Sequence, residues 1–156
     1  MKNPKLWAFI VFFLGILTFI AFFLPQFQIV IWESGEKSLI YAWGGHSKVG
    51  ATVSPLLYVI ANLWGGGAVL SLMWAGYKLR EPHRSAVAWM NWAAFFLAME
   101  LIFLLVVAEE VLTDLRILLL HADSLAASGS WLSFIVLILL LFLPGRVKKS
   151  LFRPSS

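Results

Sequence analysis

Four long apolar runs dominate this 156-residue chain and leave little of it for any other structure. A helix that crosses the ~30 Å hydrocarbon core of a bilayer needs about 20 predominantly apolar residues. Each run reaches or approaches that length, and 61% of the chain is hydrophobic. The pattern predicts an all-α integral membrane protein, with residues 1–156 forming a single transmembrane domain. Its four membrane helices are expected at about 7–24, 53–79, 85–108 and 125–143.

Charged residues are distributed unevenly around these runs. Nine of the twelve Lys and Arg residues lie before the first run, between the second and third, or after the fourth. Six of the eight acids lie in the other two connections. By the positive-inside rule, the basic side faces the cytoplasm. We therefore expect a multi-pass protein of a bacterial or archaeal cytoplasmic membrane, with both termini cytoplasmic.

The net charge of +4 raises the question of a nucleic-acid partner. The basic residues flank membrane exits instead of forming a patch interleaved with aromatic residues, so the expected partner is the lipid bilayer and no nucleic acid is expected. The chain contains no cysteine, which excludes disulfides, thiolate catalysis and Cys-based zinc or iron–sulfur centres. No cofactor is predicted.

The segment between the first two runs, about 27–43, is predicted to form a β-hairpin on the outer side. Stretches rich in β-branched and aromatic residues flank the turn-forming segment 33–37. Alternation would place Phe27, Ile29 and Ile31 together on one face. The other face also carries apolar side chains, so the hairpin is expected to lie against the membrane surface or a partner.

Residues of about 109–122 keep a helical repeat beyond the third run. Their apolar side chains recur at 3.6-residue spacing, opposite a charged face. The segment is either an extension of the third helix that projects from the membrane or an outer amphipathic helix lying on the leaflet. Asp123 or Ser124 is then the expected N-cap of the fourth helix.

Small residues in the second run are spaced for close helix packing. Gly67, Ser71 and Ala75 recur every four residues, and Gly65 and Gly66 precede them. In lipid, small residues let helix backbones approach closely where apolar surface alone gives little drive for association. They predict either packing within the bundle or a dimerisation face.

Glu100 is the one acid in the middle of an apolar run. A charged residue at that depth costs at least ~2.5 kcal/mol by insertion scales, so it should face the bundle and have a partner. Asn62 in the second run lies at nearly the same depth, and Thr18 in the first is within reach. We expect a neutral Glu100 carboxyl hydrogen-bonded to Asn62. Such a residue is a polar clamp between helices, a proton, ion or ligand site, or a docking contact for another subunit.

A second polar cluster is predicted at the outer interface. Asp123, Glu109 and Asp114 are the candidates for a pair of carboxylates that share a proton in acid/base catalysis. His121 and His46 are the candidates for metal ligands beside them. The alternative interpretation is a solvated helix face with Asp123 as a helix cap.

Ala122-Asp123-Ser124 and the basic tail at 143–149 stand before and after the fourth run. With the order of elements, they resemble lipoprotein signal peptidase, the aspartyl intramembrane signal peptidase II. The resemblance implies four helices with cytoplasmic ends, a β-rich cradle after the first helix, an outer helix before the fourth, and a catalytic role for Asp123. Glu109 stands where the family's second catalytic aspartate would be, and the family's Gly-Asn and Asn-x-Gly elements are absent.

A looser likeness is to tetraspan proteins of the claudin type, through the β-containing outer segment and the long third helix. The disulfide and the Gly-Leu-Trp motif of that family are absent.

The sequence favours a non-enzymatic role, as an accessory, scaffold or assembly subunit of a larger membrane complex. The expected partners are other membrane-protein subunits or further copies of this chain. Two alternatives remain open. One is a peptidase-like enzyme, or a ligand or ion site, at the outer interface. The other is a proton- or ion-conducting oligomer that uses Glu100.

Overall fold

The computed structural model describes residues 3–42, 44–46, 55–117 and 122–152. Within them the chain forms four long helices and a small sheet. The helices are α1 (Pro4–Phe23), α2 (Pro55–Arg80), α3 (Ser85–Ile117) and α4 (Ser128–Phe152). The strands are β1 (Pro25–Ile31), β2 (Lys37–Tyr41), β3 (Gly44–His46) and β4 (Ala122–Ala126).

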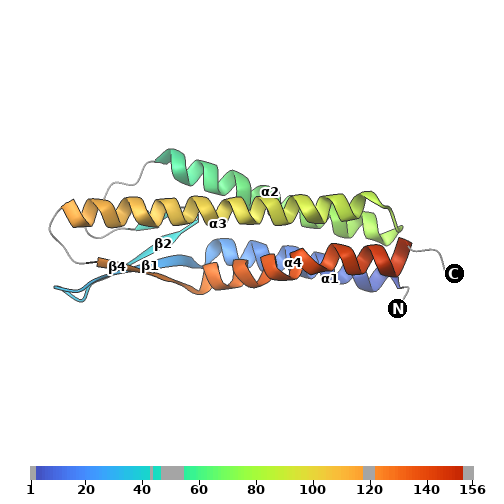
Figure 1. The fold of residues 1–156 in the computed structure, drawn as a ribbon, viewed down its shortest axis with the longest axis horizontal. Helices are drawn as coiled ribbons and strands as arrows, with labels where there is room; N and C mark the ends of the chain where they lie inside the picture. Colours follow the sequence, from blue (N-terminus) through green and yellow to red (C-terminus); the bar gives the residue numbers. More distant parts are fainter. Residues whose placement is uncertain (1–2, 43, 47–54, 118–121, 153–156) are drawn as a thin grey trace.

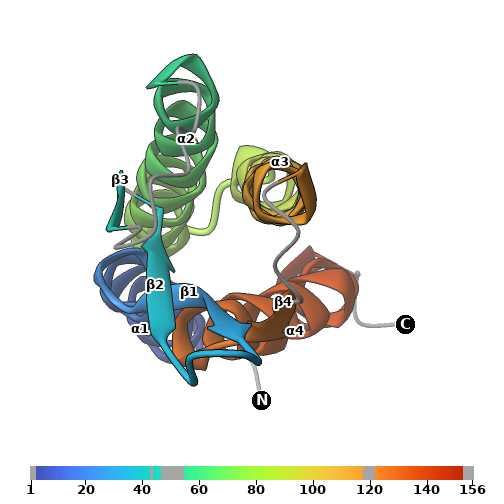
Figure 2. The same ribbon diagram turned by 90° about the vertical axis from the view of Figure 1, so that its left-hand side faces the viewer.

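The helices form an elongated bundle in which each runs along the long axis (Figure 1). Seen end-on, they follow one another around a ring in chain order, and α4 returns to contact α1 (Figure 2). Both chain termini and the α2–α3 connection lie at one end, and the sheet lies at the other. We call these the basic end and the sheet end, because the first holds the described cations Lys5, Lys78, Arg80, Arg84, Arg146, Lys148 and Lys149.

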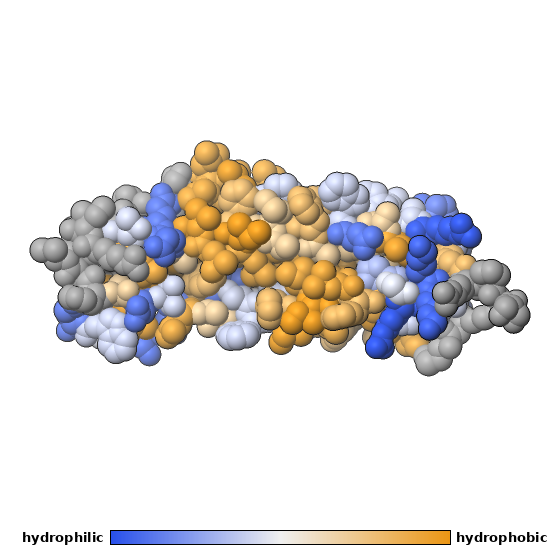
Figure 3. All heavy atoms as spheres, in the orientation of Figure 1, coloured by the Kyte–Doolittle hydropathy of each residue, from blue (hydrophilic) through white to orange (hydrophobic). Residues whose placement is uncertain are grey.

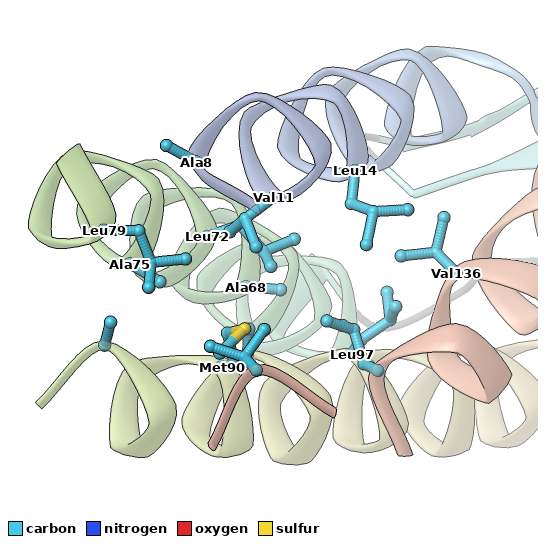
Figure 4. Close-up of a cluster of buried hydrophobic side chains, with 14 residues drawn as sticks. Ala8, Val11, Leu14, Ala68, Leu72, Ala75, Leu79, Met90, Leu97 and Val136 are labelled. Carbon is cyan, nitrogen blue, oxygen red and sulfur yellow. The ribbon is translucent and has the colours of Figure 1, made fainter. Parts of the chain in front are cut away.

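One hydrophobic core joins all four helices in the half of the bundle towards the basic end (Figure 4). Val11 and Leu14 of α1 meet Leu72 of α2, while Leu97 of α3 and Val136 of α4 complete the layer. On α2, the alanines at 68 and 75 alternate with leucines at 72 and 79, and all four are 0% exposed. Because every second contact of α2 is a small side chain, both neighbouring helices can approach it closely.

The sheet joins two segments that are far apart in the chain. The strand order is β3-β2-β1-β4, and every pair is antiparallel. β1 and β2 form the predicted hairpin, and Gly35 in its turn has a φ of +67°, a conformation that favours glycine. β4, from the connection between α3 and α4, pairs with the other edge of β1, with Ile29 opposite Ser124.

A second hydrophobic core lies between the sheet and the far half of α3. The predicted alternation is confirmed, since Phe27, Ile29 and Ile31 are all buried. They pack with the buried Leu104, Val107 and Val111 of α3, and with residues of β2, β4 and α2. The hairpin therefore lies on the long third helix.

Between residues 109 and 152, the structure decides between two alternatives and corrects two predictions: the helix caps and the bounds of the fourth helix. Of the two alternatives for residues 109–117, the extension of the third helix is the one observed: they continue α3 instead of forming a separate outer helix, because their apolar face packs on the sheet. Asp123 and Ser124 are not helix caps, because residues 122–126 pair with the free edge of β1. α4 begins at Ser128 and continues through the buried Pro144, a residue that neighbouring helices make tolerable in membrane helices. Residues 118–121 lie outside the described chain.

The face drawn in Figure 3 is mostly apolar in its middle and more polar towards both ends. Three helices are long and apolar enough to cross a membrane, namely α1, α2 from Leu56 to Arg80, and α4. Large apolar side chains point away from the protein along these helices; Phe9 is 67% exposed and Leu70 is 72% exposed. Three of the four predicted spans are therefore supported.

Candidate functional site

Glu100 lies inside the bundle, with 2% of its surface exposed. Its carboxyl group rests against Gly65 of α2: a Cβ built on Gly65 would be 2.6 Å from Oε1 and 3.1 Å from Oε2. No side chain at position 65 can be accommodated without moving that carboxyl. A glycine is therefore what allows α2 and α3 to enclose Glu100, which faces the bundle interior.

The two predicted partners of Glu100 are each bonded to their own helix. Asn62 donates from Nδ2 to the carbonyl oxygen of Tyr58 at 2.7 Å. Thr18 donates from Oγ1 to the carbonyl oxygen of Leu14 at 2.9 Å. Polar side chains in helices often donate a hydrogen bond to the backbone carbonyl four residues earlier in this way. Among the described residues, the predicted hydrogen bond between Glu100 and Asn62 is absent, although both residues lie on the helix pair expected.

The small residues of α2 pack within the bundle at four of the five predicted positions. A Cβ on Gly67 would lie 3.1 Å from Phe96 Cδ2 of α3. Gly65, Ser71 and Ala75 are buried. Gly66 is exposed, and a Cβ there would meet nothing within 4 Å. These small residues therefore account for close helix contacts within one chain, and of the five only Gly66 faces outward.

Aromatic rings seal the interface between α2 and α3 next to Glu100. The Trp64 ring lies 5.6 Å from that of Phe96, 5.9 Å from Phe95 and 6.4 Å from Phe103. The indole Nε1 is buried and finds no hydrogen-bond partner within the described chain. The interface thus holds a carboxyl and an indole N–H away from water, and sequence reasoning had not singled out Trp64 as part of it.

The structure describes only part of the predicted outer cluster of acids. Asp123 is exposed on β4, and its Oδ2 accepts a hydrogen bond from Trp32 Nε1 at 3.0 Å. Glu109 is exposed on α3. The side chains of Asp114 and His46, and the whole of His121, lie outside the described residues. Within the described ranges, no three His, Asp or Glu residues are placed to hold a metal ion.

Gln26 is a structural residue that the sequence analysis missed. It is fully buried, and its Nε2 donates to the carbonyl oxygen of Ala21 at 2.7 Å, in the last turn of α1. Its own carbonyl oxygen accepts from the backbone N–H of Ala127 at 2.9 Å and from the hydroxyl of Ser130. The side chain of Gln26 therefore holds the end of α1, while its backbone carbonyl holds the start of α4. A polar residue directly after the first apolar run was the available signal.

A groove of about 450 Å³ opens between α3 and α4 on the sheet side. Its α3 wall has lining residues at 98, 101, 102 and 105, a spacing that follows the helix axis. The strands close one end, and Ser130 lies there with its hydroxyl already bonded to Gln26. The lining is otherwise apolar or aromatic: Phe27, Ala98, Leu101, Ile102, Leu105, Ala126, Trp131, Phe134 and Leu137.

Such a lining recognises shape and apolar surface; it contains no acid or base, and its one hydroxyl, that of Ser130, is bonded to Gln26. The groove and the buried Glu100 lie on different sides of α3, which faces α4 on one side and α2 on the other. Comparison with known protein families, with curated proteins and with solved structures finds no match for this chain.

Proposed function

We propose that this chain is a four-helix integral membrane protein that acts as an accessory, scaffold or assembly subunit of a larger membrane complex. In this proposal α3 is the fourth span, parallel to three helices that are long and apolar enough to cross a bilayer. The basic end is cytoplasmic by the positive-inside rule, and so are the two chain ends that lie there. The sheet then stands on the outer side.

The observation that carries the proposal is the groove between α3 and α4. Its walls are two helices of the bundle, so in a membrane its mouth opens onto hydrocarbon. Ile102 and Leu105 on one wall are 51% and 56% exposed, and Trp131 on the other is 59% exposed. These side chains flank a floor that contains the small side chain of Ala98. Large ridges beside a small floor residue are what a packed helix requires of its neighbour.

The occupant we propose is an apolar helix of a partner membrane protein. The groove follows the helix axes for about two turns, and its polar hydroxyl is already used inside the chain. Lipid tails are as apolar as leucine, so association of helices in a membrane depends on shape. A preformed groove supplies that shape without requiring the bundle to rearrange.

The sheet adds contact surface for the same partner outside the membrane. β4 borders the groove through Ala126, and it is an edge strand of the sheet. Leu125 is 56% exposed, and Trp32, next to β1, is 67% exposed. An edge strand keeps unpaired N–H and C=O groups that another chain can use. The free edge of β4 is therefore the contact we propose at the outer end of the groove, while Leu125 lies opposite Gln28, on the other face of the sheet from Phe27.

The proposal is tested by photo-crosslinking in native membranes. We would place a benzophenone amino acid at Ile102 and at Phe134 in the groove, and at Phe9 and Phe13 on the exposed side of α1 as matched controls. We expect a discrete protein adduct from the groove positions only, identified by mass spectrometry after purification in mild detergent. Lipid adducts alone from all four positions would contradict the proposal. An adduct between two copies of this chain would replace the foreign partner with a homo-oligomer.

A further inference from the structure

A second hollow lies between α3 and α4, at the basic end. It has a volume of about 880 Å³ and is formed by the first turns of α3 and the last turns of α4. Three cations line it, together with one amide and two larger apolar side chains: Arg84, Lys148, Lys149, Asn91, Val87 and Phe152. It therefore differs in chemistry from the apolar groove further along the same helix pair.

The cations of this hollow lack the contacts made by other cations at the same end. Lys78 Nζ lies 5.1 Å from the centre of the Trp74 ring, and the Arg80 guanidinium lies 5.4 Å from that of Phe12. Arg84, Lys148 and Lys149 are exposed, and none of them forms an ion pair or ring contact with another described residue. Three positive groups around one hollow repel one another, and a bound anion would offset that repulsion.

The two helix ends at this hollow contribute electric fields of opposite sign: the C-terminus of α4 is negative and the N-terminus of α3 is positive. Lysines near the C-terminus of α4 are favourable there because the helix dipole is negative at that end. That explains the presence of Lys148 and Lys149 on α4, but not the Arg84 guanidinium across the hollow from them. Arg84 immediately precedes α3, whose N-terminus adds positive field on the same side. The net field inside the hollow favours an anion.

The remaining lining residues indicate what carries the anion. Val87 and Phe152 supply apolar surface beside the cations, and Asn91 supplies an amide further along α3. Basic pockets between membrane helices on the cytoplasmic side bind phosphate-bearing lipid headgroups. We propose that this hollow binds the phosphate of an anionic phospholipid, with its acyl chains along Val87 and Phe152. The proposal needs the helices to lie in a membrane, but it does not depend on the partner helix proposed above.

Gly145 provides a direct test. It lines the hollow, and a Cβ built there meets nothing within 4 Å, so the position opens into free space. Gly145→Phe should fill the hollow without disturbing the core. Lys148→Gln with Lys149→Gln removes two of the three charges without filling it. Lys78→Gln with Arg80→Gln is the matched control, because it removes two cations from the same end that lie outside the hollow.

We would purify each full-length variant in dodecyl maltoside and add equal amounts of phosphatidylglycerol and phosphatidylcholine. Native mass spectrometry then counts the lipids retained. We expect the wild type and the Lys78/Arg80 variant to prefer phosphatidylglycerol by roughly tenfold. The Lys148/Lys149 variant should lose the preference, and Gly145→Phe should lose the bound lipid. Circular dichroism checks that the helices remain, and Arg84→Gln replaces any variant that fails this check.

Three results would overturn the proposal. The first is equal retention of the two lipids by the wild type. The second is unchanged phosphatidylglycerol binding in both hollow variants, which would assign the lipid to another surface. The third is a rise in Tm with inorganic phosphate in lipid-free micelles that equals the rise with phosphatidylglycerol. That result would identify a soluble phosphate ligand instead of a lipid.

Discussion

The two sides of α3 make a comparison within one helix. Towards α2, the interface is closed: Gly65 and Gly67 bring the backbones together, Phe96 and Trp64 fill the space, and Glu100 is sealed inside. Towards α4, the interface is packed only in its middle, and a hollow remains at each end. The difference teaches that one face of α3 serves the fold, while the other leaves surface available for other molecules.

The residues of the facing helices explain this difference. α2 presents glycine, serine and alanine to α3, and small residues let helix backbones approach in a membrane. α4 is rich in leucine and phenylalanine and packs Val136 and Leu140 into the middle of the interface. Bulky side chains hold the backbones apart, so space remains where they turn outward. The variants below test this account, from the largest expected effect to the smallest.

Gly65→Ala should be the most damaging of these changes. The new Cβ would lie 2.6 Å from Glu100 Oε1, and overpacking of this kind costs roughly 1–3 kcal/mol of unfolding free energy. The measurement is an unfolding titration in mixed micelles. Glu100→Ala in the same chain should remove most of that cost, because it removes the atoms that the Cβ would meet.

Gly66→Ala is the control for that experiment, since a Cβ there meets nothing within 4 Å. It should be neutral or slightly stabilising, because alanine has the better helix propensity. If Gly65→Ala were equally harmless, or if Glu100→Ala failed to rescue it, the close contact between α2 and α3 would not be the source of stability.

Gln26→Leu should come next. It removes the hydrogen bond from Nε2 to Ala21 at 2.7 Å while keeping a side chain of similar size, so we expect a loss of about 0.5–1.5 kcal/mol. The measurement is the same unfolding titration. Gln28→Leu, on the less buried face of β1, should change stability much less. Equal effects of the two substitutions would mean that the bond from Gln26 Nε2 to Ala21 does not stabilise the end of α1.

Ala98→Leu tests whether the groove between α3 and α4 is distinct from the packed core. Ala98 lines the groove, so a larger side chain there should change unfolding free energy by about 0.5 kcal/mol or less. Recovery of the partner in mild detergent should nevertheless fall. Ala93→Leu is the matched change in the packed middle, where Ala93 is 0% exposed, and it should destabilise the fold. Similar stability losses in both variants would show that the groove is part of the core.

Asp123→Asn should have the smallest effect on stability. The amide oxygen of Asn can still accept the hydrogen bond from Trp32, and that contact is exposed, so a change of a few tenths of a kcal/mol is expected. Thermal unfolding of the two proteins side by side measures it. If the variant instead abolished a peptidase activity while leaving Tm unchanged, the resemblance to signal peptidase II would gain weight over the scaffold proposal.

The helices and the hairpin were predictable because their signals are local. Runs of apolar residues mark the spans, and the alternation of Phe27, Ile29 and Ile31 marks the buried face of β1. The end of the third helix and the start of the fourth were not predictable from local signals. Between them lies β4, which forms by pairing with β1, a strand almost 100 positions earlier in the chain. A segment that reads as a helix cap in isolation becomes a strand when a free edge is available.

The candidate site was predicted in part for a similar reason. Counting depth along the spans correctly placed Glu100 against α2. It predicted Asn62 as the hydrogen-bond partner of Glu100, but the Asn62 amide donates to the carbonyl oxygen of Tyr58. The neighbour of Glu100 is Gly65, which has no side chain to count. Gln26 and the two hollows between α3 and α4 arise from how elements pack. No spacing in the sequence indicates where two helices leave space between them.

The pairing of β4 with β1 also bears on how the protein is made. The ribosome synthesises β1 and β2 early, and the hairpin can form as soon as both have left it. β4 follows only after α2 and α3 have been synthesised, so the edge of β1 that it covers stays open through most of translation. During that interval another extended segment can take its place. Closure of the sheet by residues 122–126 therefore marks the moment at which the nascent chain stops being open to strand exchange.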